Sequence, residues 1–126
     1  MIKGIEAVLI GSGNAKALAE FYSEKVGVEI GEEYEMGEDS SVFEMKVGDK
    51  SAFYINSHSE VKGKATEPQR IIVNFEVDDI DEAVGNLDKA GVKKIQDKYH
   101  MEGYGYVATF EDLDGNYFQL VQVKAG

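Results

Sequence analysis

The side chains that most often carry out enzyme chemistry are scarce in this chain of 126 residues, which has two histidines and no cysteine. His58 and His100 both fall in segments predicted to be loops, where an exposed histidine is commoner than a metal ligand or a catalytic base. With both imidazoles in loops and no thiol, neither a Ser-His-Asp nor a Cys-His arrangement is plausible. The sequence therefore does not predict nucleophilic catalysis.

A second group of polar side chains lies on one predicted strand, at residues 71–77. Ile72, Asn74 and Glu76 point to the same side of that strand, because side chains alternate along a strand with a period of two. Gln119, on a later strand, could meet Glu76, and a hydrogen-bonded buried carboxylate is the commoner outcome. Acid–base chemistry by Glu76 is the alternative.

A third group is aromatic. Tyr99, Tyr104 and Tyr106 lie in a segment that also contains Gly103 and Gly105. Glycines allow such a segment to move, and tyrosines offer flat faces on which a planar cation can stack. In the alternative interpretation, Tyr106 is a core strand residue while Tyr99 and Tyr104 cover the edge of a sheet.

The overall charge limits the kinds of partner. Aspartates and glutamates number 24 against 13 lysines and arginines, which gives a formal net charge of −11 at pH 7. This excess repels nucleic acid and anionic membranes, so we expect neither as a partner; it either keeps the protein soluble or steers a cationic ligand. No apolar run approaches the roughly 20 residues of a membrane span. Without a secretory signal or cysteines, the expected compartment is the cytoplasm.

These residues are positioned by two copies of one strand-helix-strands unit. In the first copy, residues 5–10 predict a strand, and residues 11–14 predict a strand-to-helix turn, because they lack the Lys-Ser/Thr of a phosphate-binding loop. Asn14 is a suitable N-cap for a helix that ends at Gly27. Three strands are expected to follow, at residues 28–34, 41–47 and 51–56.

The second copy begins after a polar stretch. A strand at residues 71–77 precedes a helix that Asp79 caps with Glu82 three residues later, and Gly91 ends this helix. Three more strands are expected at residues 93–96, 106–110 and 117–123, with a turn at 114–116.

The two copies repeat at a spacing of about half the chain. Asn14 and Asp79 are 65 residues apart, Gly27 and Gly91 are 64 apart, and the last strands align at a spacing of 66. Two such sheets are expected to close around a shared interior with the helices outside. We expect a single domain over residues 1–126, with module one at 1–57, a linker at 58–70 and module two at 71–126.

Three segments resemble the vicinal oxygen chelate superfamily, which includes glyoxalase I, bleomycin-resistance proteins and extradiol dioxygenases. They are Phe21-Tyr22 with Gly27-Val28, residues 75–79 with 90–92, and residues 110–120. The last of them contains Asp-Leu-Asp-Gly-Asn, with Leu113 where the family usually has proline. The resemblance covers nearly the whole chain. It implies an α+β fold of paired βαβββ modules, each mixed sheet curled into a cup, and frequent dimerisation.

In the enzymes of this family, the resemblance implies a divalent metal held in the cup by the first and last strands of the modules. The corresponding positions are Ala7, Ile72, Gln119 and Phe53, or Tyr54 if the last strand of module one shifts by one residue. Ala7 and Ile72 have no donor, and Gln119 offers one neutral carbonyl oxygen. A divalent metal needs several imidazole or carboxylate ligands. We therefore expect no metal, no cofactor and no catalytic residue.

The remaining cup is expected to hold a small molecule. The candidate ligand-binding residues are Ala7, Leu9, Phe53, Ile72, Asn74, Glu76, Tyr104, Tyr106 and Gln119. The chain is similar to the metal-free bleomycin-resistance type, which implies a cytoplasmic homodimer that confers antibiotic resistance by sequestering a cationic or planar aromatic compound. The alternatives are a metal-dependent isomerase, lyase or dioxygenase with an atypical site, and an interaction module whose cup is filled by its own side chains.

Overall fold

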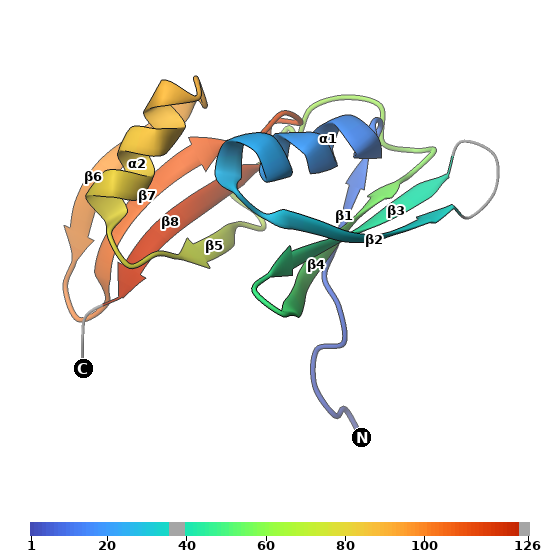
Figure 1. Cartoon of the computed structure of the whole chain (residues 1–126), viewed down its shortest axis with the longest axis horizontal. Coiled ribbons are helices and arrows are strands. Elements are labelled where there is room, and N and C mark those ends of the chain that lie inside the picture. The colour runs from blue at the N-terminus through green and yellow to red at the C-terminus, as the bar shows by residue number, and fades with distance from the viewer. Residues whose placement is uncertain (36–39, 124–126) are drawn as a thin grey trace. The chain divides into compact units, whose positions relative to one another are not determined.

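The computed structural model describes residues 1–35 and 40–123 and divides into two compact units, Met1–Gly63 and Lys64–Gly126. The first unit contains β1 (Leu9–Ser12), α1 (Ala15–Phe21), the π-helical turn η1 (Tyr22–Val26), β2 (Glu29–Glu35), β3 (Ser41–Val47) and β4 (Lys50–Ser57). The second contains β5 (Val73–Glu76), α2 (Ile80–Lys89), β6 (Lys94–Met101), β7 (Gly105–Glu111) and β8 (Tyr117–Val123). The predicted βαβββ order is confirmed in both units (Figure 1).

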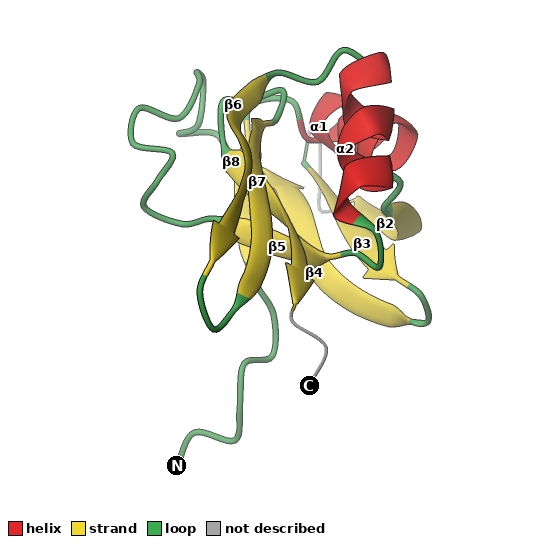
Figure 2. Cartoon of the chain, turned by 90° about the vertical axis from the view of Figure 1, so that its left-hand side faces the viewer, coloured by secondary structure: helices red, strands yellow, loops and turns green. Residues whose placement is uncertain are grey.

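Each unit builds one mixed four-stranded sheet. The strand orders are β1-β4-β3-β2 and β5-β8-β7-β6. The first strand of each unit runs parallel to the last, and the other neighbours are antiparallel. Helix α1 packs on β3 and β4, and α2 packs on β7 and β8. Each helix covers one face of its own sheet (Figure 2), and we call the other face of each sheet its distal face.

The core of each unit lies between its helix and its sheet. Alternate residues of β3, β4, β7 and β8 point to the helices, because side chains along a strand alternate between its two faces. The ring centroids of Tyr22 and Phe53 lie 5.6 Å apart, and those of Phe110 and Phe118 lie 5.9 Å apart. All four side chains are buried.

The helix ends agree with the sequence prediction. The side chain of Asn14 accepts a hydrogen bond from the backbone N–H of Ala17 at 3.1 Å, and Asp79 accepts one from Glu82 at 3.1 Å. Both N-caps are therefore confirmed. The first helix continues through η1 to Gly27, whose positive φ of 92° suits a residue without a Cβ.

Two strands differ from the prediction by more than two residues at one end. The first strand starts at Leu9 and includes residues 11–12, which were predicted to be in a turn. The physical reason is its partner: β1 pairs in parallel with residues 54–57 of β4, and the ladder begins where the Tyr54 N–H meets the Val8 carbonyl oxygen at 2.9 Å. The predicted strand at 93–96 extends to Met101, because β7 pairs along its whole length. His100 therefore lies on a strand and not in a loop.

Candidate functional site

The register of the parallel strand pairs places Gln119 and its module-one counterpart on the distal faces. Asn74 pairs with Gln119 in the second unit, and Leu9 pairs with Tyr54 in the first. Leu9 and Asn74 are 65 residues apart, and so are Tyr54 and Gln119. The module-one counterpart of Gln119 is therefore Tyr54. Phe53 points to the helix, is only 2% exposed and contacts Tyr22. The prediction that Phe53 faces the cup is wrong, because the sequence alignment shifted this strand by one residue and so exchanged its faces.

The distal face of the second sheet carries a pocket of about 510 Å³, which we call the amide pocket. It is lined by Gln69, Ile72, Ile95, Gln96, Tyr99, Thr109, Tyr117 and Gln119. The Gln119 Nε2 donates a hydrogen bond to Thr109 Oγ1 at 2.9 Å. Thr109 is nearly buried, and this bond holds the Gln119 amide at the wall of the pocket. The side chains that line the pocket are neutral and combine flat aromatic, aliphatic and amide groups.

Two predicted residues, Ile72 and Gln119, line this pocket. Asn74 lies on the same face as Gln119, and Glu76 lies beside Val121, but neither Asn74 nor Glu76 lines the pocket. Both are exposed, so the predicted buried pairing of Glu76 with Gln119 is not found.

Five lining residues did not stand out in the sequence: Gln69, Ile95, Gln96, Thr109 and Tyr117. Two of them carried a usable signal. Tyr117 is two residues before Gln119 and must share its face, and Thr109 is the cross-strand partner of Gln119. Gln69, Ile95 and Gln96 lie on other segments, and their places depend on tertiary packing.

The three tyrosines of the segment 99–106 do not lie together. Tyr99 lines the amide pocket. The Oε1 of Gln122 accepts a hydrogen bond from the backbone N–H of Ile80 in α2 at 2.9 Å, so the Gln122 side chain lies on the helix side. Tyr106 is the cross-strand partner of Gln122, and its ring therefore lies on the same side. Tyr104 lies in the turn between β6 and β7, outside the pocket lining. The predicted grouping of Tyr104 and Tyr106 with Gln119 is therefore not found.

The ring of Tyr106 contacts basic side chains instead. The Lys98 Nζ lies 5.1 Å from its centroid, and the His100 ring centroid lies 5.1 Å away. Lys98 also forms an ion pair of 2.8 Å with Asp81, and this hydrogen-bonded carboxylate raises the pKa of Lys98 above its ordinary value. Tyr106 therefore takes part in a surface cluster on the helix side, with 40% of the residue exposed.

The distal face of the first sheet is acidic and aromatic. We call Leu9, Tyr34, Glu44 and Tyr54 the tyrosine face, because strand register and alternation place them on one side. Leu9 is 63% exposed. Ala7 is half-buried and precedes the strand.

The charges of the tyrosine face interact. Glu44 accepts hydrogen bonds from the Ser51 hydroxyl and from the backbone N–H of Glu32, and these bonds hold the pKa of Glu44 below its ordinary value. The pKa of Tyr34 is raised, because it is partly removed from water and the carboxylates of Glu32 and Glu44 disfavour its phenolate. Tyr34 is thus a neutral ring beside negative charge.

The family positions do not fit a divalent metal. Ala7 and Ile72 have no donor atom, Tyr54 offers a phenol, and Gln119 offers one amide oxygen. In the part of the chain that the structure describes, no three His, Cys, Asp or Glu side chains come together in a way that could hold a metal ion. A divalent cation needs several imidazole or carboxylate ligands, and these positions supply neither.

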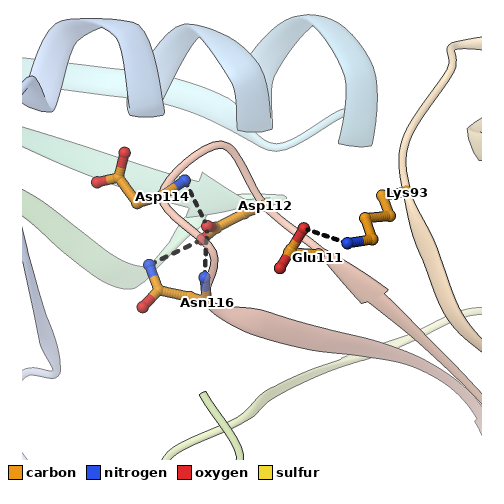
Figure 3. Close-up of polar contacts among 5 residues, drawn as sticks. All are labelled: Lys93, Glu111, Asp112, Asp114 and Asn116. Carbon is orange, nitrogen blue, oxygen red and sulfur yellow. Dashed lines mark hydrogen bonds and ion pairs between the residues drawn. The ribbon is translucent and has the colours of Figure 1, made fainter. Parts of the chain in front are cut away.

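The turn before β8 positions one wall of the amide pocket. Asp112, 5% exposed, accepts hydrogen bonds from the backbone N–H groups of Asp114 and Asn116, each at 2.9 Å, and from Asn116 Nδ2 at 3.0 Å (Figure 3). Gly115 adopts φ 80° within the turn. The chain then enters β8 at Tyr117, so the turn fixes where the strand begins and which residues face the pocket.

Two βαβββ units, with this turn before the last strand, define the glyoxalase class of folds. The sequence model of the Glyoxalase/Bleomycin resistance protein/Dioxygenase superfamily matches residues 4–120, and the chain belongs to this superfamily.

Individual relatives match nearly the whole chain. The chain is 30% identical over 121 residues to the uncharacterized protein YetH of Bacillus subtilis, covering 95% of this chain and 98% of YetH. It shares the fold of TnmS3, an antibiotic binding protein from Streptomyces sp. CB03234, with a TM-score of 0.72, 18% identity and coverage of 98% and 100%. It also shares the fold of the fosfomycin resistance protein FosX from Listeria monocytogenes, with a TM-score of 0.71, 17% identity and coverage of 98% and 94%. Among the described helices, none is long and apolar enough to span a membrane.

Proposed function

We propose that this chain is a metal-independent small-molecule-binding protein whose amide pocket takes a planar aromatic compound. The observation that carries the proposal is Gln119, which stands at the family's metal-ligand position but donates a hydrogen bond to Thr109 at 2.9 Å. A neutral amide held in this way is a hydrogen-bonding group for an organic ligand and a poor ligand for a divalent metal.

The composition of the amide pocket supports a planar ligand. Tyr99 and Tyr117 offer aromatic faces, and Ile72 and Ile95 offer apolar surface. Amide and hydroxyl groups supply directional hydrogen bonds, while the volume of about 510 Å³ is in the range of small-molecule sites. Such pockets combine mostly apolar surface with a few polar groups that orient the ligand.

A positive charge on the ligand is the finer part of the proposal. The net charge of −11 attracts cations from a distance. The shared fold with an antibiotic binding protein is compatible with sequestration of a drug-like compound, although at 18% identity this likeness concerns the fold alone.

The test is calorimetric titration with planar aromatic cations and with neutral compounds of the same shape. Tyr99→Ala should lower the affinity by about two- to tenfold, because an aromatic contact contributes roughly 0.5–1.5 kcal/mol. Tyr106→Ala is the matched control, since it removes the same side chain from the opposite face of the sheet. No saturable binding across the panel, or equal losses in the two variants, would count against the proposal.

The rival function is a metal-dependent isomerase, lyase or dioxygenase with an atypical site, and the enzymes named in the superfamily description favour it. Elemental analysis of purified protein separates the two. A stoichiometric content of nickel, iron, zinc or manganese would overturn the metal-independent proposal.

We further propose that the protein acts as a cytoplasmic homodimer. Both units leave large apolar side chains exposed, with Ile5 at 86%, Leu9 at 63% and Ile71 at 73%, and a second copy could cover them. The absence of cysteine agrees with a reducing compartment. Sedimentation equilibrium tests the dimer, and a single species at the 13.9 kDa of one chain would exclude it.

A further inference from the structure

A second pocket lies in the first unit, at the edge of the sheet where the parallel strands β1 and β4 both end. Its volume is about 600 Å³. It is lined by Ser12, Gly13, Ser40, Ser57, His58, Ser59, Val61 and Lys62. We propose that this serine pocket binds the phosphate group of a small organic molecule. The site is separate from the amide pocket, and none of its residues was assigned a binding role from the sequence.

The loop that forms the serine pocket is held in place by its backbone. The His58 N–H donates to the Ser12 carbonyl oxygen at 3.1 Å, which ties the loop to the end of β1. The Val61 N–H donates to the His58 carbonyl oxygen at 3.0 Å and closes a turn. A Cβ on Gly13 would lie 2.7 Å from the Val61 carbonyl oxygen, so glycine allows the two segments to approach this closely. The lining side chains are thus presented from a defined backbone.

The polar groups of the serine pocket are mainly donors. His58 Nδ1 accepts a hydrogen bond from the backbone N–H of Glu60 at 3.1 Å, so the neutral ring carries its proton on Nε2, which is a donor. Ser57 Oγ accepts from the Ser41 N–H at 3.3 Å, which leaves its hydroxyl proton for another acceptor. Lys62 adds a cation. An ammonium group, an imidazole N–H and serine hydroxyls are groups that bind phosphate oxygens.

The lining of the serine pocket carries a cation, Lys62, in an acidic chain. The chain has a formal net charge of −11, yet the lining of this pocket, within the described residues, includes no aspartate or glutamate. Lys62 is the charged side chain among these lining residues, and Glu60 lies in the same loop without lining the pocket. Local charge therefore permits an anionic group here, although the whole molecule repels extended polyanions.

The same contacts argue against a hydrolytic role for His58 and a neighbouring serine. In a catalytic triad, the histidine donates from Nδ1 to a carboxylate and accepts the serine proton at Nε2. Here Nδ1 already accepts from a backbone N–H, so Nε2 carries a proton and cannot take another while the ring is neutral. The arrangement favours binding over proton abstraction.

The size of the serine pocket favours a phosphate ester over the free ion. A volume of about 600 Å³ is in the range of sites for small organic molecules and exceeds what a bare phosphate fills. Val61 supplies apolar surface for the organic part of such a ligand.

The experiment is a titration of the ¹⁵N-labelled full chain, followed by amide chemical shifts, with inorganic phosphate and separately with glycerol 3-phosphate. Saturable shifts are expected at Gly13, Ser59 and Lys62. Tighter binding of glycerol 3-phosphate supports an organic ester as the natural source, and equal affinity supports free phosphate. Lys62→Ala should weaken binding at least about tenfold, because it removes a charge-assisted hydrogen bond.

Lys64→Ala is the matched control. Lys64 carries the same charge, lies two residues after Lys62 and does not line the pocket. It should leave the affinity within about twofold of the original. Ser59→Ala serves as a second variant that changes no charge and should also weaken binding. The absence of saturable shifts with both phosphates, or equal weakening by Lys62→Ala and Lys64→Ala, would overturn the proposal.

Discussion

Removal of the Asp112 carboxylate should destabilise the second unit by about 2–3 kcal/mol. This nearly buried carboxylate accepts two backbone N–H groups at 2.9 Å and the Asn116 side chain at 3.0 Å. Asp112→Ala leaves both backbone donors without this acceptor, at roughly 1–3 kcal/mol each. The lower end of that range applies, because Asp114 and Asn116 are only half-buried and water can reach them. Urea unfolding followed by far-ultraviolet circular dichroism measures the loss.

Two further variants separate hydrogen bonding from a general effect on the turn. Asp112→Asn retains one oxygen for both backbone donors but turns an NH₂ group toward Asn116, so it should cost about 1 kcal/mol. Leu113→Ala is the control, since Leu113 is 47% exposed in the same turn, and it should stay within about 0.5 kcal/mol of the original. If Asp112→Ala lost no more than Leu113→Ala, the attribution to these hydrogen bonds would be refuted.

Three further predictions concern other parts of the chain. Phe53→Ala should cost about 3–5 kcal/mol in urea unfolding, because the ring is 2% exposed, and Tyr54→Ala should cost less than half as much; equal losses would contradict the assignment of faces. Asp79→Ala should cost about 1 kcal/mol by removing the N-cap of α2, and Asp78→Ala, whose side chain does not cap the helix, should cost much less. The pKa of Glu44 is lowered in the folded chain. The ionised carboxylate therefore stabilises the fold at pH values above its ordinary pKa of 4.5, and this contribution disappears as the pH falls through the lowered pKa. The stability difference between the natural chain and Glu44→Gln should therefore shrink from about pH 6 to about pH 3, and a constant difference would exclude this linkage.

Much of the fold could be predicted from local signals. The caps Asn14 and Asp79 and the helix stop at Gly27 appear in the structure as predicted, because side-chain capping and a positive φ depend on neighbouring residues alone. The strands at 41–47 and 117–123 have their predicted bounds. The start of β1 could not be predicted, because it depends on where β4 pairs with it. The pairing begins at Leu9, so residues 5–7 have no strand partner although their sequence favours a strand.

The candidate site was harder to predict than the fold, because it depends on which face each residue takes. A shift of one residue placed Phe53 in the cup, whereas the register places Tyr54 there. Tyr106 was grouped with Gln119 because of its place in a tyrosine-rich segment, yet strand alternation directs it to the helix side. Ile72 and Gln119 both line the amide pocket, and their role in binding a ligand stays a prediction.

The common spacing of 65 residues shows how the two distal faces have diverged. In the first sheet Glu44 is the cross-strand partner of Tyr54, and in the second sheet Thr109 is the cross-strand partner of Gln119. Tyr54 therefore corresponds to Gln119, and Glu44 corresponds to Thr109. The second sheet thus presents an amide hydrogen-bonded to a hydroxyl, and the first presents a phenol beside a carboxylate. A ligand suited to neutral amides does not suit an acidic surface equally well, so the two distal faces are not chemically equivalent. A titration with a planar aromatic ligand is therefore expected to show one high-affinity site per chain and not two equal sites.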